Sequence, residues 1–366
     1  MFSELSRFLD HFLEMGVPGY DCVIYHHGEC VFRRFRGVSD VEYQIPMNGK
    51  ERYNLYSCTK PVTCTAALQL YEQGRLSLDD PIEKYLPAFA GMNVHTKDGL
   101  VPLRRSIQVK NLFMMTAGFS YDLNSPSLEQ VRRDTDGRCP TQTVMTYLAR
   151  EPLLFEPGTS WHYSLCHDVL AAVVEAVSGQ RFGDYLRDHI FKPLGMKRSA
   201  LHMDDRDPAI PLYFYQGSDK PLRKVSPGEP DYVSYRLGPD YDSGGAGLVS
   251  TVEDYIRFLE ALRTGTILCP ETVELMQMDH LSCCVNPALR STGYGLGVRC
   301  KKEGTKNPKE FGWDGAGGAY LTVDLEQDFT LFYAQHLAYS PNGFTEPRLT
   351  HRLHDIAGRA LASNTR

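Results

Sequence analysis

Ser57 and Lys60 are the residues of this sequence whose types and spacing most directly indicate chemistry. They begin and end Ser57-Cys58-Thr59-Lys60, the single Ser-x-x-Lys of the chain. Residues three apart on a helix share a face, so the lysine amine can reach the serine hydroxyl. A serine attacks a carbonyl group only when another group takes its proton, and a desolvated lysine can do so. The spacing predicts a serine nucleophile, although chance supplies about one such spacing in a chain of this length.

A helix is predicted over 57–73 to position this pair. Its apolar residues recur through Val62, Ala66 and Leu70, and Gly74 follows as a C-cap. The helix would begin at Ser57, so its free N–H groups and the positive end of its dipole would face a developing oxyanion.

Two further segments offer groups that could complete a site. Tyr163 follows Pro157-Gly158 and stands at a turn before a predicted helix. The stretch 311–318 is a glycine-dense approach to a strand, where a substrate carbonyl could come close to the backbone. Together with the Ser57 helix, these segments predict a cleft between helices and a sheet.

These segments, in this order, resemble the serine β-lactamase and penicillin-binding fold, in particular its class C, D-aminopeptidase and β-lactamase-like carboxylesterase (family VIII) branch. The resemblance covers nearly the whole chain and includes four more segments, Val109–Phe119, Pro193–Met196, Ser243–Thr251 and Gly293–Gly297. It implies an enzyme that works through an acyl-enzyme and needs neither a cofactor nor a metal.

The resemblance also implies roles for individual positions. Ser57 is the acylated nucleophile, Lys60 its general base or proton partner, and Tyr163 a tyrosine that shares the proton transfer, so that the identity of the base stays open. The backbone N–H groups of Ser57 and Ala316 would form the oxyanion hole. The residues expected to bind substrate are Trp313, Gly315, Tyr121, Leu165 and His167.

Two departures from the family pattern bear on the substrate. The tyrosine motif usually ends in Asn, and here that position is Leu165; the third motif usually begins with Lys or His, and here it is Trp313. Both changes replace a polar group that holds peptide-like, anionic substrates with apolar surface. A buried carboxylate without a cation costs several kcal/mol, whereas a neutral ester does not incur this cost. We therefore expect a carboxylesterase acting on small esters.

Two alternatives remain open at this point. The first is an intracellular β-lactamase or a D-amino-acid peptidase or amidase, in which an arginine from 203–242 would hold the substrate carboxylate. The second is a non-catalytic binding protein of the same fold. The joint presence of Ser57, Lys60 and Tyr163 argues against the second.

The pattern of elements predicts an α+β fold with a central antiparallel sheet built from both ends of the chain. Hairpin strands at 21–25 and 30–35 and strands at 294–299, 319–323 and 329–334 would form the sheet. Helical spacing occurs near 106–116, 127–149, 166–178 and 181–190. We expect a discontinuous sheet lobe, 1–75 and 243–366, and an inserted helical lobe, 76–242, with an irregular excursion at 203–242.

Composition excludes several other classes of function. The 366 residues carry a net charge of −6 without an extended basic patch, so binding to nucleic acid or to a membrane surface is not expected. The first residues lack the basic start and the cleavage site of a signal peptide, which predicts a cytoplasmic protein. The ten cysteines are expected to be mostly buried free thiols. A small-molecule ester or amide is the expected partner, and the oligomeric state stays open.

Overall fold

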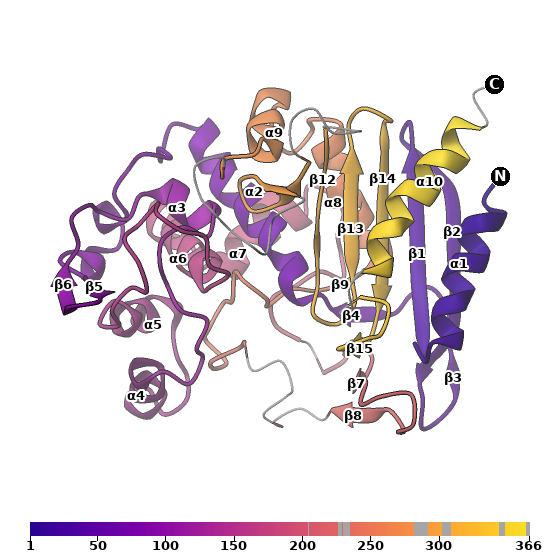
Figure 1. Ribbon diagram of the computed structural model, residues 1–366, viewed down its shortest axis with the longest axis horizontal. Coiled ribbons are helices and arrows are strands. Elements are labelled where there is room, and N and C mark those ends of the chain that lie inside the picture. The colour runs from indigo at the N-terminus through magenta and orange to yellow at the C-terminus, as the bar shows by residue number, and fades with distance from the viewer. Residues whose placement is uncertain are drawn as a thin grey trace.

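An eight-stranded antiparallel sheet forms one side of the molecule, in the order β10-β11-β12-β13-β14-β1-β2-β3. The computed structural model describes residues 1–203, 205–225, 229, 235–281, 292–301, 309–343 and 348–363. The sheet strands are β1 (Gly19–His26), β2 (Glu29–Asp40), β3 (Ile45–Pro46), β10 (Gly293–Tyr294), β11 (Arg299–Cys300), β12 (Glu310–Asp314), β13 (Tyr320–Asp324) and β14 (Phe329–Gln335). Because β1 pairs with β14, the two ends of the chain lie side by side (Figure 1). The α+β prediction is confirmed.

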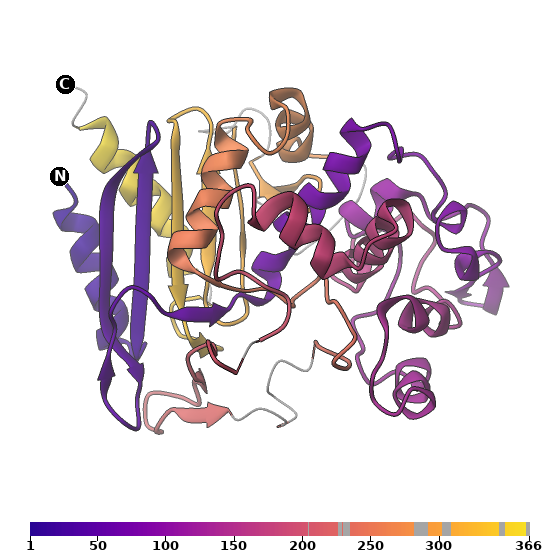
Figure 2. The ribbon, with the colours of Figure 1, turned by 180° about the vertical axis from the view of Figure 1, so that it is seen from behind.

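Side chains of the central strands alternate between two apolar layers. Cys22 and Ile24 face α1 (Ser3–Glu14) and α10 (Arg352–Ala362), which cover one face of the sheet. Val23 between them faces the opposite layer, on the side of α8 (Val252–Arg263). Figure 2, seen from behind, shows α8 lying across this second face. The period of two in the strands thus places the sheet between helices on both faces.

A group of helices lies beside the sheet, on the left of Figure 1. It includes α2 (Thr59–Glu72), α3 (Val109–Phe113), α4 (Pro126–Asp134), α5 (Thr141–Leu148), α6 (Cys166–Ser178) and α7 (Phe182–Leu186), while α9 (Pro270–Gln277) follows α8. Helix α2 is buried around almost its whole circumference and packs against α6. A helix buried on all sides needs no polar face, which explains why α2 is not amphipathic.

Two predicted elements are each divided in the structure. The segment 127–149 forms α4 and α5, because Asp136 and Gly137 adopt positive φ angles of 48° and 75° and Pro140 follows. The predicted strand 294–299 forms β10 and β11, which pair as a hairpin around Gly297 at a φ of 86°. In both cases the chain reverses at residues with left-handed backbone.

The excursion at 203–242 contains regular structure that the sequence did not predict. Strands β7 (Leu212–Phe214) and β8 (Arg223–Val225) form a small sheet with β15 (Leu337–Ala338), which follows β14. Part of the predicted helical lobe thus joins the sheet side of the molecule. The two-lobe division at 75 and 243 stays a prediction.

Smaller elements complete the described chain. Strand β4 (Arg52–Asn54) pairs with β9 (Val249–Thr251), and β5 (Asn93–Thr96) pairs with β6 (Gly99–Pro102). Short helical turns occupy Tyr56–Cys58, Ile82–Lys84, Pro87–Phe89, Arg187–Phe191 and Leu349–His351.

Most cysteines of the described chain are buried free thiols, as predicted. Cys30 and Cys269 are free but exposed, and Cys283 and Cys284 lie outside the described residues. The helices in the described ranges are too short or too polar to cross a membrane. The buried free thiols are Cys22, Cys58, Cys64, Cys139, Cys166 and Cys300.

Candidate active site

Ser57 lies in a tight turn between β4 and α2. The residue before it, Tyr56, has a φ of 47°, a left-handed conformation that costs a non-glycine residue free energy. The turn is held on both sides, because Leu55 donates its N–H to Leu248 O at 2.9 Å and the Tyr255 hydroxyl donates to Cys58 O at 2.6 Å. The strained turn therefore presents the Ser57 hydroxyl at the beginning of α2.

The Ser57 hydroxyl contacts both of the groups predicted to exchange its proton. Its Oγ lies 2.5 Å from the Tyr163 hydroxyl and 3.2 Å from Lys60 Nζ. The Lys60 ammonium also donates to Gly245 O at 2.7 Å and lies 4.6 Å from the centre of the Tyr163 ring. Lys60 is fully buried. A Lys60 amine or a Tyr163 oxygen that has lost its own proton thus lies within hydrogen-bond reach of the Ser57 hydroxyl, which is the geometry that general base catalysis requires.

The glycine-dense turn after β12 packs directly against the turn that holds Ser57. A Cβ atom on Gly315 would lie 2.5 Å from Leu55 O, and one on Gly317 would lie 3.3 Å from Asn54 O. At Gly315 this approach requires glycine, and at Gly317 a side chain would be tight. It places Ala316 beside Ser57 on the wall of one cavity, an arrangement that supports the predicted oxyanion hole of the two backbone N–H groups.

A cavity of about 560 Å³ opens in front of Ser57, and aromatic rings form much of its wall. The Tyr163 ring stacks on Trp313, with centroids 6.0 Å apart and planes at 18°, and contacts Tyr121 at 5.3 Å. Tyr235 contacts Tyr121 at 5.8 Å, and Trp161 contacts Tyr163 at 6.3 Å. The predicted cavity residues Tyr121, Trp313 and Gly315 do line it, and Trp161 and Tyr235 were not predicted.

Another part of the wall carries charged groups that pair with one another. Asp314 accepts from His351 Nε2 at 2.9 Å and from Arg348 at 3.3 Å. Burial opposes ionisation of Asp314, but the charges of His351 and of nearby arginines hold the pKa of its carboxyl below the usual value. Arg299 makes a two-pronged contact of 2.8 and 3.0 Å with buried Glu310, whose pKa falls to about 2 against the effect of burial. The charges of this wall are therefore compensated within the protein.

Leu165 and His167 do not reach the cavity, which corrects the prediction that they contact substrate. Leu165 is buried at the N-terminus of α6. His167 is fully buried; its Nε2 lies 3.1 Å from Phe113 O and 3.6 Å from Cys64 Sγ. Burial and the neighbouring Lys60 ammonium lower its pKa to about 3, so it is a neutral core residue. The start of α6 turns His167 towards α3 and α2, which carry Phe113 and Cys64.

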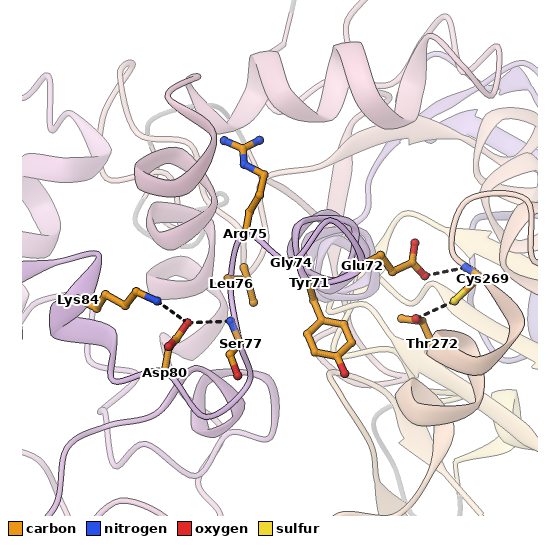
Figure 3. A pocket seen from close by; sticks show the side chains of 10 residues that line it. All are labelled: Tyr71, Glu72, Gly74, Arg75, Leu76, Ser77, Asp80, Lys84, Cys269 and Thr272. Carbon is orange, nitrogen blue, oxygen red and sulfur yellow. Dashed lines mark hydrogen bonds and ion pairs between the residues drawn. The ribbon is translucent and has the colours of Figure 1, made fainter.

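A second hollow, of about 780 Å³, lies at the C-terminal end of α2 (Figure 3). Its polar groups contact each other: Lys84 pairs with Asp80 at 3.0 Å, and Glu72 accepts from the backbone N–H of Cys269 at 2.7 Å. Ser77, the serine on its wall, accepts only a backbone N–H in the contacts that the described residues make. In the described part of the chain, no lysine, histidine or tyrosine contacts the Ser77 hydroxyl to take its proton.

Comparison with known proteins identifies relatives of this chain. The family model described as Beta-lactamase matches residues 5–354. The chain belongs to the beta-lactamase family. The chain is a serine hydrolase. Esterase EstB of Burkholderia gladioli is 30% identical over 353 residues, which cover 89% of this chain and 88% of the relative.

Two solved structures share the fold along nearly the whole chain. EstCE1, titled a hydrolase with promiscuous acyltransferase activity, superimposes with a TM-score of 0.80 at 25% identity and covers 97% of this chain and 98% of its own. Unliganded simvastatin synthase from Aspergillus terreus gives a TM-score of 0.75 at 20% identity, with coverage of 98% and 97%. At that identity the second likeness concerns the fold alone.

Within this beta-lactamase family chain, Trp313 offers a test of the aromatic wall. Replacing it by alanine, Trp313→Ala, removes the ring that stacks on Tyr163 and opens the cavity to water. We expect KM for p-nitrophenyl butyrate to rise about tenfold, the effect of losing roughly 1.4 kcal/mol of apolar and stacking contact. Trp313→Phe, which keeps a ring, serves as the control and should stay near the wild-type KM. An unchanged KM in Trp313→Ala would show that the ring does not contact substrate.

Proposed function

We propose that this chain is a carboxylesterase that hydrolyses small neutral esters through an acyl-enzyme on Ser57. The observation that carries the proposal is the contact of the Ser57 hydroxyl with both the Lys60 amine and the Tyr163 hydroxyl, at the wall of a cavity rich in aromatic rings. The esterase among the relatives supports the same conclusion. The cytoplasmic location inferred from the sequence stays a prediction.

The proposed reaction has two steps at one serine. Ser57 Oγ attacks the ester carbonyl while its proton passes to Lys60 or Tyr163, and the N–H groups of Ser57 and Ala316 stabilise the oxyanion. The carbon–oxygen bond to the alcohol then breaks, and the alcohol leaves with that proton. Water attacks the acyl-enzyme by the same route, releases the carboxylic acid and returns the proton to Ser57.

The charges of the cavity favour a neutral ester over a β-lactam or a peptide C-terminus. A substrate carboxylate needs a cation, and the arginines on the wall, Arg299 and Arg348, already contact Glu310 and Asp314. The segment 203–242 contributes Tyr235 to the wall, while its Arg236 donates to Gly247 O at 2.8 Å instead. A carboxylate would have to compete with these pairs, at a cost of several kcal/mol.

A comparison of substrates tests this proposal. We expect p-nitrophenyl acetate and butyrate to be hydrolysed with a kcat/KM at least about a hundredfold above that of a chromogenic cephalosporin, which corresponds to roughly 2.7 kcal/mol in the transition state. Initial rates at matched concentrations, measured by absorbance, decide the point. Equal values for the two substrate classes would favour the β-lactamase or amidase alternative.

A further inference from the structure

Asp168 is a buried carboxyl group in the first turn of α6, five residues after Tyr163. It is 2% exposed, and two hydroxyl groups donate to its Oδ1: that of Tyr241 at 3.0 Å and that of Ser243 at 2.8 Å. A carboxyl group this far from solvent needs such donors to remain ionised.

The backbone of Gly245 connects this carboxyl group to Lys60. A Cβ atom on Gly245 would lie 2.4 Å from Asp168 Oδ2, so the carboxyl group packs directly on the glycine backbone. The Gly245 N–H donates to the carboxyl group. The carbonyl of the same residue accepts from Lys60 Nζ at 2.7 Å. Asp168 thus contacts Gly245, and Gly245 in turn contacts Lys60.

Charge supports the same connection. Lys60 is fully buried, and the oxygens it contacts, Ser57 Oγ and Gly245 O, are neutral. Burial raises the pKa of Asp168, while the Lys60 ammonium is the largest influence opposing that rise. Asp314, on the cavity wall, is already paired with His351 and Arg348. Burial keeps six other titratable groups close to Lys60 and Asp168 neutral at pH 7, because it raises the pKa values of Cys58, Cys64, Tyr121, Cys166 and Tyr241 and lowers the pKa of His167. The rings of Tyr121 and Tyr163 also face Lys60 Nζ, at 5.8 and 4.6 Å.

We propose that Asp168 is the positioning residue of Lys60, through the Gly245 backbone and as its buried counter-charge. The inference rests on the proposed esterase function and adds to it a residue outside the cavity. Its negative charge favours the protonated forms of the groups around Ser57. Its anchoring of Gly245 fixes where the Lys60 amine lies.

The variant Asp168→Asn tests both parts of this role, because it keeps the shape of the side chain and removes the charge. We expect kcat for p-nitrophenyl butyrate to fall about ten- to a hundredfold, as small displacements of a catalytic group do. We also expect both limbs of the pH profile of kcat/KM to move to lower pH by about one unit, the effect of removing one nearby opposite charge. A merely structural role would lower the melting temperature without moving the limbs.

Glu175→Gln is the matched control, since Glu175 is a carboxyl group of the same helix that accepts from Phe182 N–H at 2.9 Å, away from Lys60. Its pH profile should coincide with that of the wild type. If Asp168→Asn does not fold, Tyr241→Phe and Ser243→Ala each remove one donor to Asp168 and should move the limbs in the same direction by less. Limbs that coincide with the wild type in every folded variant would overturn the proposal. An inactive wild type would instead contradict the esterase function itself.

Discussion

Replacing Ser57 by alanine is expected to lower kcat/KM for p-nitrophenyl butyrate at least about a thousandfold, because the loss of a nucleophile removes the acyl-enzyme route altogether. The melting temperature should change little, since Ser57 lies at the cavity wall and the turn is held by contacts of Leu55 and Cys58. Steady-state kinetics and thermal unfolding of the purified variant provide the two measurements.

Ser77→Ala is the matched control for that experiment. Ser77 lines the larger hollow at the end of α2, where no described contact activates its hydroxyl. We expect this variant to keep wild-type activity. A loss of activity in Ser77→Ala with activity retained in Ser57→Ala would move the active site to the second hollow.

Replacing Lys60 by methionine should lower kcat by about a thousandfold, the loss typical of removing a group that takes the proton of the nucleophile. Methionine has nearly the length of lysine and fills the same buried space, and Asp168, left without its counter-charge, should take up a proton, so the fold should be kept. KM should change less than kcat, because Lys60 contacts Ser57 and Gly245 and does not line the described cavity.

Lys84→Met provides the control for the lysine, since Lys84 is paired with Asp80 at the edge of the other hollow. It should retain full activity. If Lys60→Met also kept more than about a tenth of the wild-type kcat, the proton of Ser57 would pass to Tyr163 without help from the lysine.

The sheet could be predicted from the sequence because its signals are local. Alternation through Cys22, Val23 and Ile24 and the turn at His27 and Gly28, both with positive φ, specify a hairpin without reference to the rest of the chain. The short strand β7 escaped prediction because its partner β15 is more than a hundred residues away, and β8, which pairs with β7, is just as short. Such pairing leaves no periodic signal in a three-residue strand.

The candidate site could be predicted from the sequence only where spacing and the order of motifs gave a signal. Ser57 and Lys60 are three residues apart, and the order of motifs led to Tyr163, Trp313 and Ala316. The sequence did not predict which way side chains near the start of α6 point, because this depends on the rotation of that helix about its axis. Leu165 and His167 were therefore assigned to the cavity, and Asp168 was not recognised as a neighbour of Lys60.

Trp161 and Tyr235 show two different reasons for a missed residue. Trp161 stands two positions before Tyr163 and is one of only two tryptophans in the chain, so the sequence offered a signal for it. Tyr235 comes from the segment 203–242, which has no regular sequence pattern, and lines the cavity in contact with Tyr121 and Tyr56. A cavity residue such as Tyr235 can be recognised only from the folded chain.

The central claim is that Ser57 forms a covalent acyl-enzyme, and covalent labelling tests it most directly. The purified protein is incubated with a fluorophosphonate probe, its intact mass is measured, and the labelled peptide is sequenced by mass spectrometry. We expect a mass increase of one probe on the peptide that contains Ser57, and no increase in Ser57→Ala. An unlabelled wild type, or equal labelling of Ser57→Ala, would contradict it.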